Sequence, residues 1–275
     1  MSSRFTGEGA RTDFTPIRGW EHVALVGLVV AVEDLGDEVE DVAEYALDAV
    51  EAAEVKFARW GGCDPHGLTL DEAAAITLYT KQNVGRPEKS FYAVLNRRCW
   101  ERDRSKIVPF FPYLKLFFTG ARKLPNACPY QLFRAFPNRP ADWQATYAIG
   151  TQLHWWGFSS TTKTSKVLLS ESFFGTQGER TLFMVDGING IDVSPYSDFP
   201  EDEVLLMPGA KFEVTQVMEP EMLGGAAMIA MRQVSSRHDI LSFEPAEGPE
   251  PAFAPASAPA ELAQPIAGAR NLTLL

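Results

Sequence analysis

The chain has 275 residues, a mass of 30.4 kDa, a formal net charge of −11 and a pI of about 4.9. This acidity argues against electrostatic binding to nucleic acid or to anionic lipid, so any phosphate-bearing ligand has to meet a local basic group. A hydrophobic content of 45% is enough for a substantial buried core.

The cysteines are few and scattered. Cys63, Cys99 and Cys128 form no metal-ligand spacing with the histidines, which predicts free thiols in a reducing compartment and no metal site. The first residues resemble no signal peptide, and the apolar run 23–32 is too short to span a bilayer. These features predict a cytoplasmic protein that does not bind membranes.

Helical periodicity dominates the first 125 residues. From about His22 to Trp60, apolar residues recur at threes and fours among many acidic ones, which predicts an acidic amphipathic helix that Gly27 and Gly36 can break. Its acidic face would suit a basic partner, although a solvated face is the simpler interpretation. We assign residues 1–68 to an N-terminal segment built on this helix.

Three further helices follow. Thr69-Leu70-Asp71-Glu72 predicts a capping box that opens a helix from Leu70 to about Thr80. Residues 90–101 and 113–123 carry core-facing stripes of apolar side chains and predict the other two helices.

After residue 124 the pattern changes to short, aromatic or β-branched segments between turn residues, which predicts strands. The candidates are Tyr130–Phe136, Thr151–Trp156, Thr181–Val185, Val204–Met207, Lys211–Val217 and Ala226–Val234, with hairpin-like turns at 186–190 and 207–209. Helices followed by strands indicate an α+β fold with a mostly antiparallel sheet, which we place over residues 69–243. Residues 244–275 are rich in Pro, Ala and Glu and predict a disordered tail.

One arginine interrupts the first predicted strand. By strand parity Arg134 shares a face with Leu132 and Phe136, so we expect its guanidinium to be half-buried. A buried guanidinium needs an anion. The strand alone allows a structural salt bridge or a clamp for a pyrophosphate or carboxylate.

A run of hydroxyl residues, 159–162, follows the second predicted strand. It can form a turn or an N-cap for a helix predicted over Lys163–Phe174. Alternatively, it can hold a ribose and orient a carboxylate.

Two glutamates precede the apolar run 204–207. If that run is a strand, its period of two points Glu201 and Glu203 to the same face. Such a pair is often only a solvated acidic turn. It can also hold a sugar hydroxyl with one carboxylate and contact a second reactant with the other.

An arginine, a hydroxyl run and Glu-x-Glu on successive strands resemble the Arg-Ser-Glu class of mono-ADP-ribosyltransferases. The resemblance extends from about Thr69 to Val217 and includes Leu132-Phe133-Arg134, Gly157-Phe158-Ser159-Ser160-Thr161-Thr162 and the long stretch from Asp192 to Leu205. This sequence differs in Ala135, where glycine is common, and in Thr162, where the family usually has a second serine.

The resemblance implies an ADP-ribosyltransferase-like fold, NAD as substrate, no metal, and a protein with an exposed arginine as acceptor. Arg134 would bind a phosphate of NAD, and Ser160 would orient Glu203, which holds the hydroxyls of the nicotinamide ribose. Glu201 would contact the acceptor guanidinium and help to remove its proton. Residues that would line the nicotinamide side are Thr161, Thr162 and Phe174, although Phe174 can equally be core.

Two alternatives stay open. The first is an NAD glycohydrolase, which would use the same site without an acceptor. The second is a non-catalytic NAD-binding or interaction module. We expect His154 to be a hydrogen-bonded structural residue. A serine hydrolase and a Rossmann dehydrogenase are disfavoured, because the chain has no Gly-x-Ser-x-Gly elbow and residues 187–190 form a turn.

Overall fold

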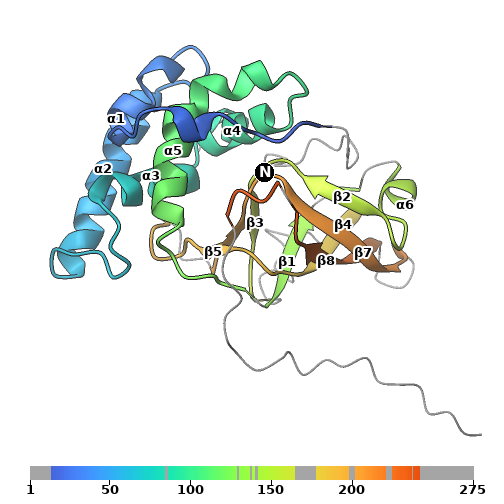
Figure 1. Cartoon of the computed structure of the whole chain (residues 1–275). Helices are drawn as coiled ribbons and strands as arrows, with labels where there is room; N and C mark the ends of the chain where they lie inside the picture. Colours follow the sequence, from blue (N-terminus) through green and yellow to red (C-terminus); the bar gives the residue numbers. More distant parts are fainter. Residues whose placement is uncertain are drawn as a thin grey trace, which may run out of the picture. The chain divides into compact units, whose positions relative to one another are not determined.

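Helices form the first half of the described chain and strands the second, in the predicted order (Figure 1). The computed structural model describes residues 14–83, 86–128, 130–136, 138–139, 142–164, 178–197, 202–220, 225–236 and 238–241. Its helices are α1 (Leu28–Ala31), α2 (Val42–Arg59), α3 (Leu70–Thr80), α4 (Phe91–Cys99), α5 (Phe111–Ala121) and α6 (Trp143–Thr146). Its strands are β1 (Gln131–Phe136), β2 (Gln152–Trp155), β3 (Ser159–Thr161), β4 (Arg180–Asp186), β5 (Ile191–Asp192), β6 (Val204–Leu206), β7 (Ala210–Met218) and β8 (Ala226–Val234).

The acidic helix expected over residues 22–60 is broken at Gly27 and Gly36, where the sequence allowed a break. The chain forms the short α1, a 3-10 turn at Glu33–Leu35 and further turns before α2 begins at Val42. Asp41, which precedes α2, has a left-handed φ of 55°, a conformation that Asp tolerates better than most residues. Turns can bury Val32, Leu35 and Val39 as fully as a helix would, so the apolar spacing did not reveal the break.

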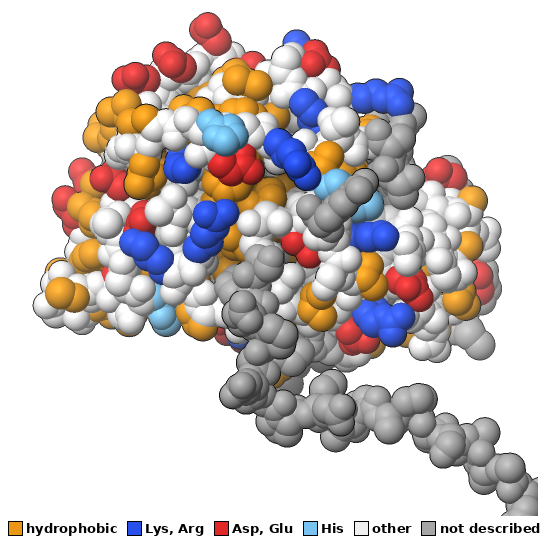
Figure 2. Space-filling view, in the orientation of Figure 1, with side chains coloured by type: hydrophobic (Ala, Val, Ile, Leu, Met, Phe, Trp, Pro, Cys, Tyr) orange, Lys and Arg blue, Asp and Glu red, His pale blue; other side chains and the backbone are white. Residues whose placement is uncertain are grey.

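The acidic side chains of this region lie mostly at the surface. Figure 2 shows them spread over the α1–α2 part of the molecule. Two are used internally, since Glu38 pairs with Arg98 of α4 and Glu40 pairs with Arg86 and Lys89. These pairs hold the 36–41 turns against the region of α4.

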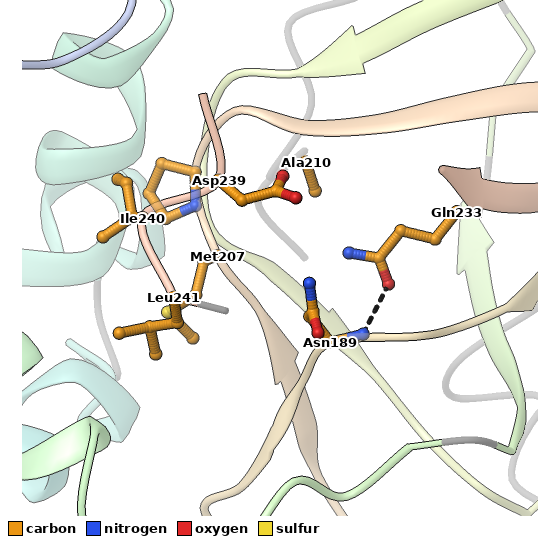
Figure 3. A pocket seen from close by; sticks show the side chains of 8 residues that line it. Asn189, Met207, Ala210, Gln233, Asp239, Ile240 and Leu241 are labelled. Atoms are coloured by element: carbon orange, nitrogen blue, oxygen red, sulfur yellow. Dashed lines mark hydrogen bonds between the residues drawn. The ribbon is translucent and has the colours of Figure 1, made fainter. Parts of the chain in front are cut away.

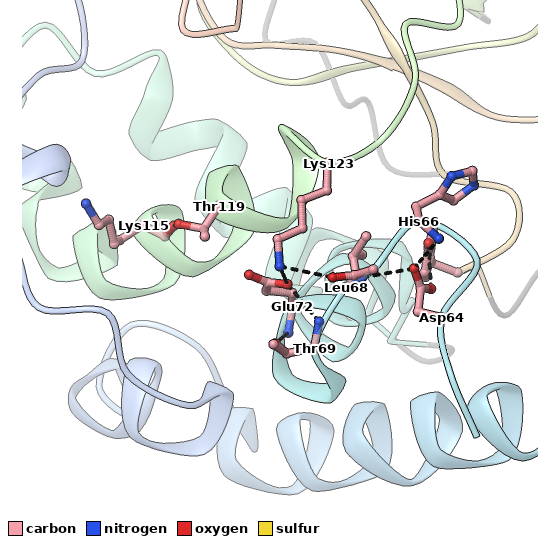
Figure 4. Close-up of polar contacts among 10 residues, drawn as sticks. Asp64, His66, Leu68, Thr69, Glu72, Lys115, Thr119 and Lys123 are labelled. Atoms are coloured by element: carbon pink, nitrogen blue, oxygen red, sulfur yellow. Dashed lines mark hydrogen bonds and ion pairs between the residues drawn. The ribbon is translucent and has the colours of Figure 1, made fainter.

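Helix α3 confirms the predicted capping box. The Thr69 hydroxyl accepts from the Glu72 backbone N–H at 3.3 Å, and the Glu72 carboxylate accepts from the Thr69 N–H at 2.8 Å. Figure 4 shows that Lys123, which follows α5, reaches the same carboxylate at 2.6 Å. The start of α3 is therefore joined to the end of α5.

In the part of the chain that the structure describes, the strands form two sheets. The larger has the order β1-β4-β8-β7-β2, and the smaller has the order β3-β6-β5. Among the described strands, β4 and β8 are the one parallel pair; the other pairings are antiparallel, as predicted for most of the sheet.

The two hairpin-like turns are not hairpins. The 186–190 turn leads from β4 in the large sheet to β5 in the small one, and the 207–209 turn leads from β6 back to β7. The Gln233 side chain of β8 holds the first turn by accepting from the N–H groups of Ile188 and Asn189 at 2.8 and 3.0 Å. Gly and Pro correctly marked the turns, but they did not show that the chain changes sheets there.

Two hydrophobic clusters meet at the small sheet. One cluster contains the helices together with Phe158, Val193, Tyr196 and Leu205. The other lies between the sheets and contains Val204 and Leu206. Consecutive residues of β6 therefore point into different clusters.

Several expectations lie outside the described residues: most of the helix expected over 163–174, and the tail from 244 onward. Residues 162–164, which are described, are not helical. The domain boundary at residue 68 stays a prediction, and α2 packs against α3 across it. Among the described helices, none combines the length and apolar character needed to cross a bilayer.

Candidate active site

Arg134 is more deeply buried than its sequence position predicted, with 6% of its surface exposed. It lies on β1, on the same buried face as Leu132 and Phe136. Its Nη1 donates to the backbone oxygen of Ser160 at 2.9 Å, and its guanidinium carbon lies 4.8 Å from the centre of the Phe136 ring. The guanidinium thus links β1 to the hydroxyl run directly.

The hydroxyl run is a strand of its own rather than the end of β2. Strand β3 pairs with β6, and Thr162, just after it, forms a bridge with Phe133 of β1 through hydrogen bonds of 2.8 and 2.9 Å. The run therefore lies between β1 and β6, which is why Arg134 and Glu203 approach it from opposite sides.

Three hydroxyls of the run have different surroundings. Thr161 is buried and donates to the Val204 backbone oxygen at 2.7 Å, and the Thr162 hydroxyl accepts from the Thr164 N–H at 3.1 Å. Within the described part of the chain, the half-buried Ser160 hydroxyl makes no hydrogen bond. Of the three, Ser160 is the one whose hydroxyl is left for a ligand.

The backbone of Glu203 is held on both sides. Its N–H donates to the Ser194 hydroxyl at 2.9 Å, and its oxygen accepts from the Val193 N–H at 3.0 Å. The neighbouring Asp202 accepts from the Thr164 hydroxyl at 3.2 Å. The bond from Val193 continues the β5–β6 pairing to the residue before β6. Together these bonds fix the backbone at Glu203.

Strand register places Ser160 and Glu203 on one face of the small sheet. Ser160 is paired with Leu205, and Glu203 lies two residues before Leu205 along the extended chain. Diagonal neighbours in such a pair are about 7–8 Å apart, which a glutamate side chain can span. Among the described residues, the two side chains form no direct hydrogen bond, so the orienting role of Ser160 stays a prediction.

An ion pair lies at β5, where Asp192 is paired with Val204 and therefore points to the face opposite Ser160 and Glu203. Lys163 Nζ is 3.1 Å from the Asp192 carboxylate and 5.4 Å from the centre of the Tyr130 ring. Burial acts to raise the pKa of Asp192, but hydrogen bonds from Ser194 and Lys163 outweigh it and hold the pKa below its usual value. Asp192 therefore stays ionised and keeps Lys163 beside β5.

Not all of the predicted site residues lie in the part of the chain that the structure describes. Arg134, Ser160 and Thr161 lie on β1 and β3, and Thr162 and Glu203 lie directly next to β3 and β6. Glu201 and Phe174 lie outside the described residues. Sequence reasoning assigned no role to Ser194, Thr164 or Asp202, although Ser194 and Asp202 belong to the quoted 192–205 stretch.

A small hollow, shown in Figure 3, lies where the 186–190 and 207–209 turns meet the last described residues. Its volume of about 10 Å³ is room for about one water molecule. Asn189, Gln233 and Asp239 contribute its polar groups, and neither Arg134, Ser160 nor Glu203 lines it. It is not the place for a dinucleotide.

His154 differs from expectation. Among the described residues, neither of its ring nitrogens has a hydrogen-bond partner, and the ring stacks on Trp156 with centroids 5.0 Å apart. Burial first, and then the nearby Lys211 and His238, lower the pKa of His154 to about 4. The residue is a neutral packing group rather than a hydrogen-bonded one.

Comparison with known protein families gives one match over most of the chain. A family model described as NAD:arginine ADP-ribosyltransferase matches residues 34–237. An erythroblast NAD(P)(+)–arginine ADP-ribosyltransferase of Gallus gallus is 30% identical over 167 residues, which are 57% of this chain and 50% of that protein. A T-cell ecto-ADP-ribosyltransferase 2 of Mus musculus is 40% identical over 52 residues, which are 19% of this chain and 17% of that protein. The matched regions thus span half or less of these relatives.

Solved structures agree on the fold. A mutant of the eukaryotic mono-ADP-ribosyltransferase ART2.2 in complex with NADH has a TM-score of 0.54 and 18% identity, over 76% of this chain and 85% of that chain. A second mutant, in complex with NAD, has a TM-score of 0.53 and 19% identity over the same shares. These likenesses confirm the expected α+β fold of helices followed by mostly antiparallel strands.

Proposed function

Since the chain belongs to the NAD:arginine ADP-ribosyltransferase family, we propose that it transfers ADP-ribose from NAD to an arginine side chain of a protein and releases nicotinamide. The observation that carries the proposal is the convergence of Arg134, Ser160 and Glu203 on adjoining strands. Arg134 donates to the backbone of Ser160, and Ser160 shares a sheet face with Glu203. The matched regions span 50% of the Gallus gallus relative and 17% of the Mus musculus relative, so acceptor and partners belong to the proposal.

The proposed chemistry breaks the bond between nicotinamide and its ribose and forms a new bond from the ribose to a guanidinium nitrogen. Positive charge develops on the sugar as nicotinamide leaves with the bond electrons. A carboxylate at Glu203 that holds the ribose hydroxyls stabilises this charge more in the transition state than in the ground state. The fixed backbone of Glu203 supports this role, because a preorganised group needs little rearrangement during the reaction.

The other proposed roles follow from charge and position. The buried cation of Arg134 suits a phosphate of NAD, and the available hydroxyl of Ser160 suits the Glu203 carboxylate or the ribose. Glu201 would accept the proton that the acceptor guanidinium loses on forming its new bond. Thr161 would act through β6, since its hydroxyl is engaged by Val204. Phe174 and Thr162 remain proposed neighbours of nicotinamide.

The proposal is tested by nicotinamide release from NAD, with and without agmatine as a free arginine analogue. Wild-type release should rise with agmatine. Glu203→Gln should abolish release in both conditions, because no carboxylate then stabilises the sugar cation. Glu219→Gln, which removes an exposed carboxylate away from the site, is the matched control and should behave like wild type.

Glu201→Gln separates the two half-reactions. It should keep much of the basal release and lose the increase with agmatine, because only the acceptor needs that carboxylate. If agmatine does not change nicotinamide release in either wild type or Glu201→Gln, the glycohydrolase would be favoured. Bound NAD with no release at all would leave only a binding module. Cytoplasmic location and the identity of the protein acceptor stay predictions.

A further inference from the structure

The turn formed by residues 193–197 is bonded to the helical half of the protein at Tyr196, through both its side chain and its backbone oxygen. Tyr196 is fully buried, with 0% of its surface exposed. Its hydroxyl donates to the carboxylate of Asp64 at 2.8 Å, and its backbone oxygen accepts from Lys56 Nζ and from the Thr77 hydroxyl, both at 2.8 Å. Tyr196 is thus bonded at both of its polar ends.

The Asp64 carboxylate is itself fixed. Its other oxygen accepts from the N–H groups of His66 and Leu68 at 2.8 and 3.0 Å, as Figure 4 shows. Burial, and then the bond to Asp64, raise the pKa of the Tyr196 hydroxyl. The hydroxyl therefore stays protonated and remains the donor at any working pH.

The same turn holds Glu203. The N–H groups of Tyr196 and Ser197 both donate to the Val193 oxygen, at 2.9 and 3.0 Å. Val193 N–H in turn donates to the Glu203 oxygen, and the Ser194 hydroxyl accepts from the Glu203 N–H. A continuous path of hydrogen bonds leads from Asp64 to the backbone of Glu203.

We propose that Tyr196 is a positioning residue that fixes the backbone of Glu203 from the helical half, through its bond to Asp64. The inference rests on the proposed function, because it assigns Glu203 a place in that reaction. Misplacing a reacting group by about 1 Å can cost on the order of a hundredfold in rate, so loss of the anchor should be visible in kcat.

The competing explanation is that Tyr196 only fills the core. Tyr113 provides the matched control, because it is also fully buried in the helical cluster and its hydroxyl also makes one bond, to the Ala75 oxygen at 2.9 Å. Tyr113→Phe and Tyr196→Phe each remove one buried hydroxyl. Tyr113 does not contact the 193–197 turn through its hydroxyl.

The kinetic experiment measures nicotinamide release against NAD concentration for wild type and both variants. Tyr196→Phe should lower kcat about tenfold with KM for NAD changed less than about twofold, whereas Tyr113→Phe should keep both within about twofold. Equal kcat values for the two folded variants would overturn the proposal. Thr77→Val, which removes one of the two bonds to the Tyr196 backbone oxygen, should also lower kcat and serves if Tyr196→Phe does not fold.

Amide hydrogen exchange at Glu203 gives a readout that does not need activity. Tyr196→Phe should speed exchange of this amide about tenfold relative to Tyr113→Phe, because the bond to Ser194 opens more often. If exchange is faster but the protein releases no nicotinamide, the result would support the positioning role of Tyr196 and contradict only the proposed function. Equal exchange in the two variants would overturn the anchor itself.

Discussion

Ser160 carries the sharpest expectation for a single residue. The hydroxyls of Thr161 and Thr162 are engaged by backbone groups, while Ser160 shares a face with Glu203. Ser160→Ala should therefore lower kcat for nicotinamide release about tenfold or more with little change in Tm.

The adjacent Ser159 is the matched control. It is the same residue type one position earlier, so it points to the opposite face of β3, where it is buried. Ser159→Ala should leave kcat within about twofold of wild type. Equal losses in the two variants would show that β3 tolerates no change and that Ser160 has no special role.

His154 predicts how stability depends on pH. Its folded pKa of about 4 lies below the value of about 6.5 expected in the unfolded chain. Between these values the unfolded state binds a proton that the folded state does not. The contribution of His154 to the free energy of unfolding should thus be constant above about pH 6.5 and should fall as the pH drops toward 4.

His154→Phe should remove that slope while keeping a ring against Trp156. Urea unfolding at pH 7 and pH 5 should show that wild type loses roughly 1–2 kcal/mol more than the variant between the two pH values. His66→Gln, at an exposed position, serves as the control. A variant that loses as much stability as wild type would assign the acid sensitivity to other groups.

At the scale of elements, the approach to β3 depends on a glycine. A Cβ at Gly157 would lie 2.9 Å from both the Asn96 Oδ1 and the Trp100 Nε1 atoms. The same Asn96 oxygen accepts from the Phe158 N–H at 2.8 Å, so any shift of Asn96 would disturb the residue just before β3.

Gly157→Ala should consequently lower Tm by several degrees and reduce nicotinamide release. Gly36→Ala is the control, because a Cβ there meets no atom within 4 Å and the backbone φ of −58° suits any residue. The measurement is the Tm of each variant in thermal unfolding. Similar Tm values would mean that the α4–β3 contact yields easily to an added methyl group.

Elements with a strong local signal were predictable. The capping box at Thr69 and the run to Thr80 gave α3 its bounds, and an apolar segment between turn residues gave β8 its bounds at Ala226 and Val234. Strands β3 and β5 have only three and two residues, too few for a periodic pattern. Their pairing depends on β6 and on the bridge to β1, which are contacts between distant parts of the chain.

The candidate site, too, has features that the sequence reveals locally and features that depend on contacts between distant residues. Arg134, Ser160 and Glu203 were recognisable from residue type and order. The bonds that hold them, from Ser194 to Glu203 and from Tyr196 to Asp64, join positions 9 and 132 residues apart. No local propensity encodes such pairs, so they could be seen only in the folded chain.

At the scale of the whole molecule, the Ser160 and Glu203 part of the site lies at the small sheet, to which both hydrophobic clusters contribute. Leu205 packs into the helical cluster, while Val204 and Leu206 pack into the cluster between the sheets. Glu203 directly precedes these residues. Its position therefore depends on both halves of the molecule, and in the proposed reaction the helices would act by positioning Glu203.

The most direct test of the central claim is the product itself. Wild type and Glu203→Gln are incubated with NAD and agmatine, and the mixtures are examined by mass spectrometry for mono-ADP-ribosylated agmatine. The account predicts the adduct, together with equimolar nicotinamide, from wild type and neither product from Glu203→Gln. Folded wild type that yields free ADP-ribose without adduct, or leaves NAD intact, would contradict it.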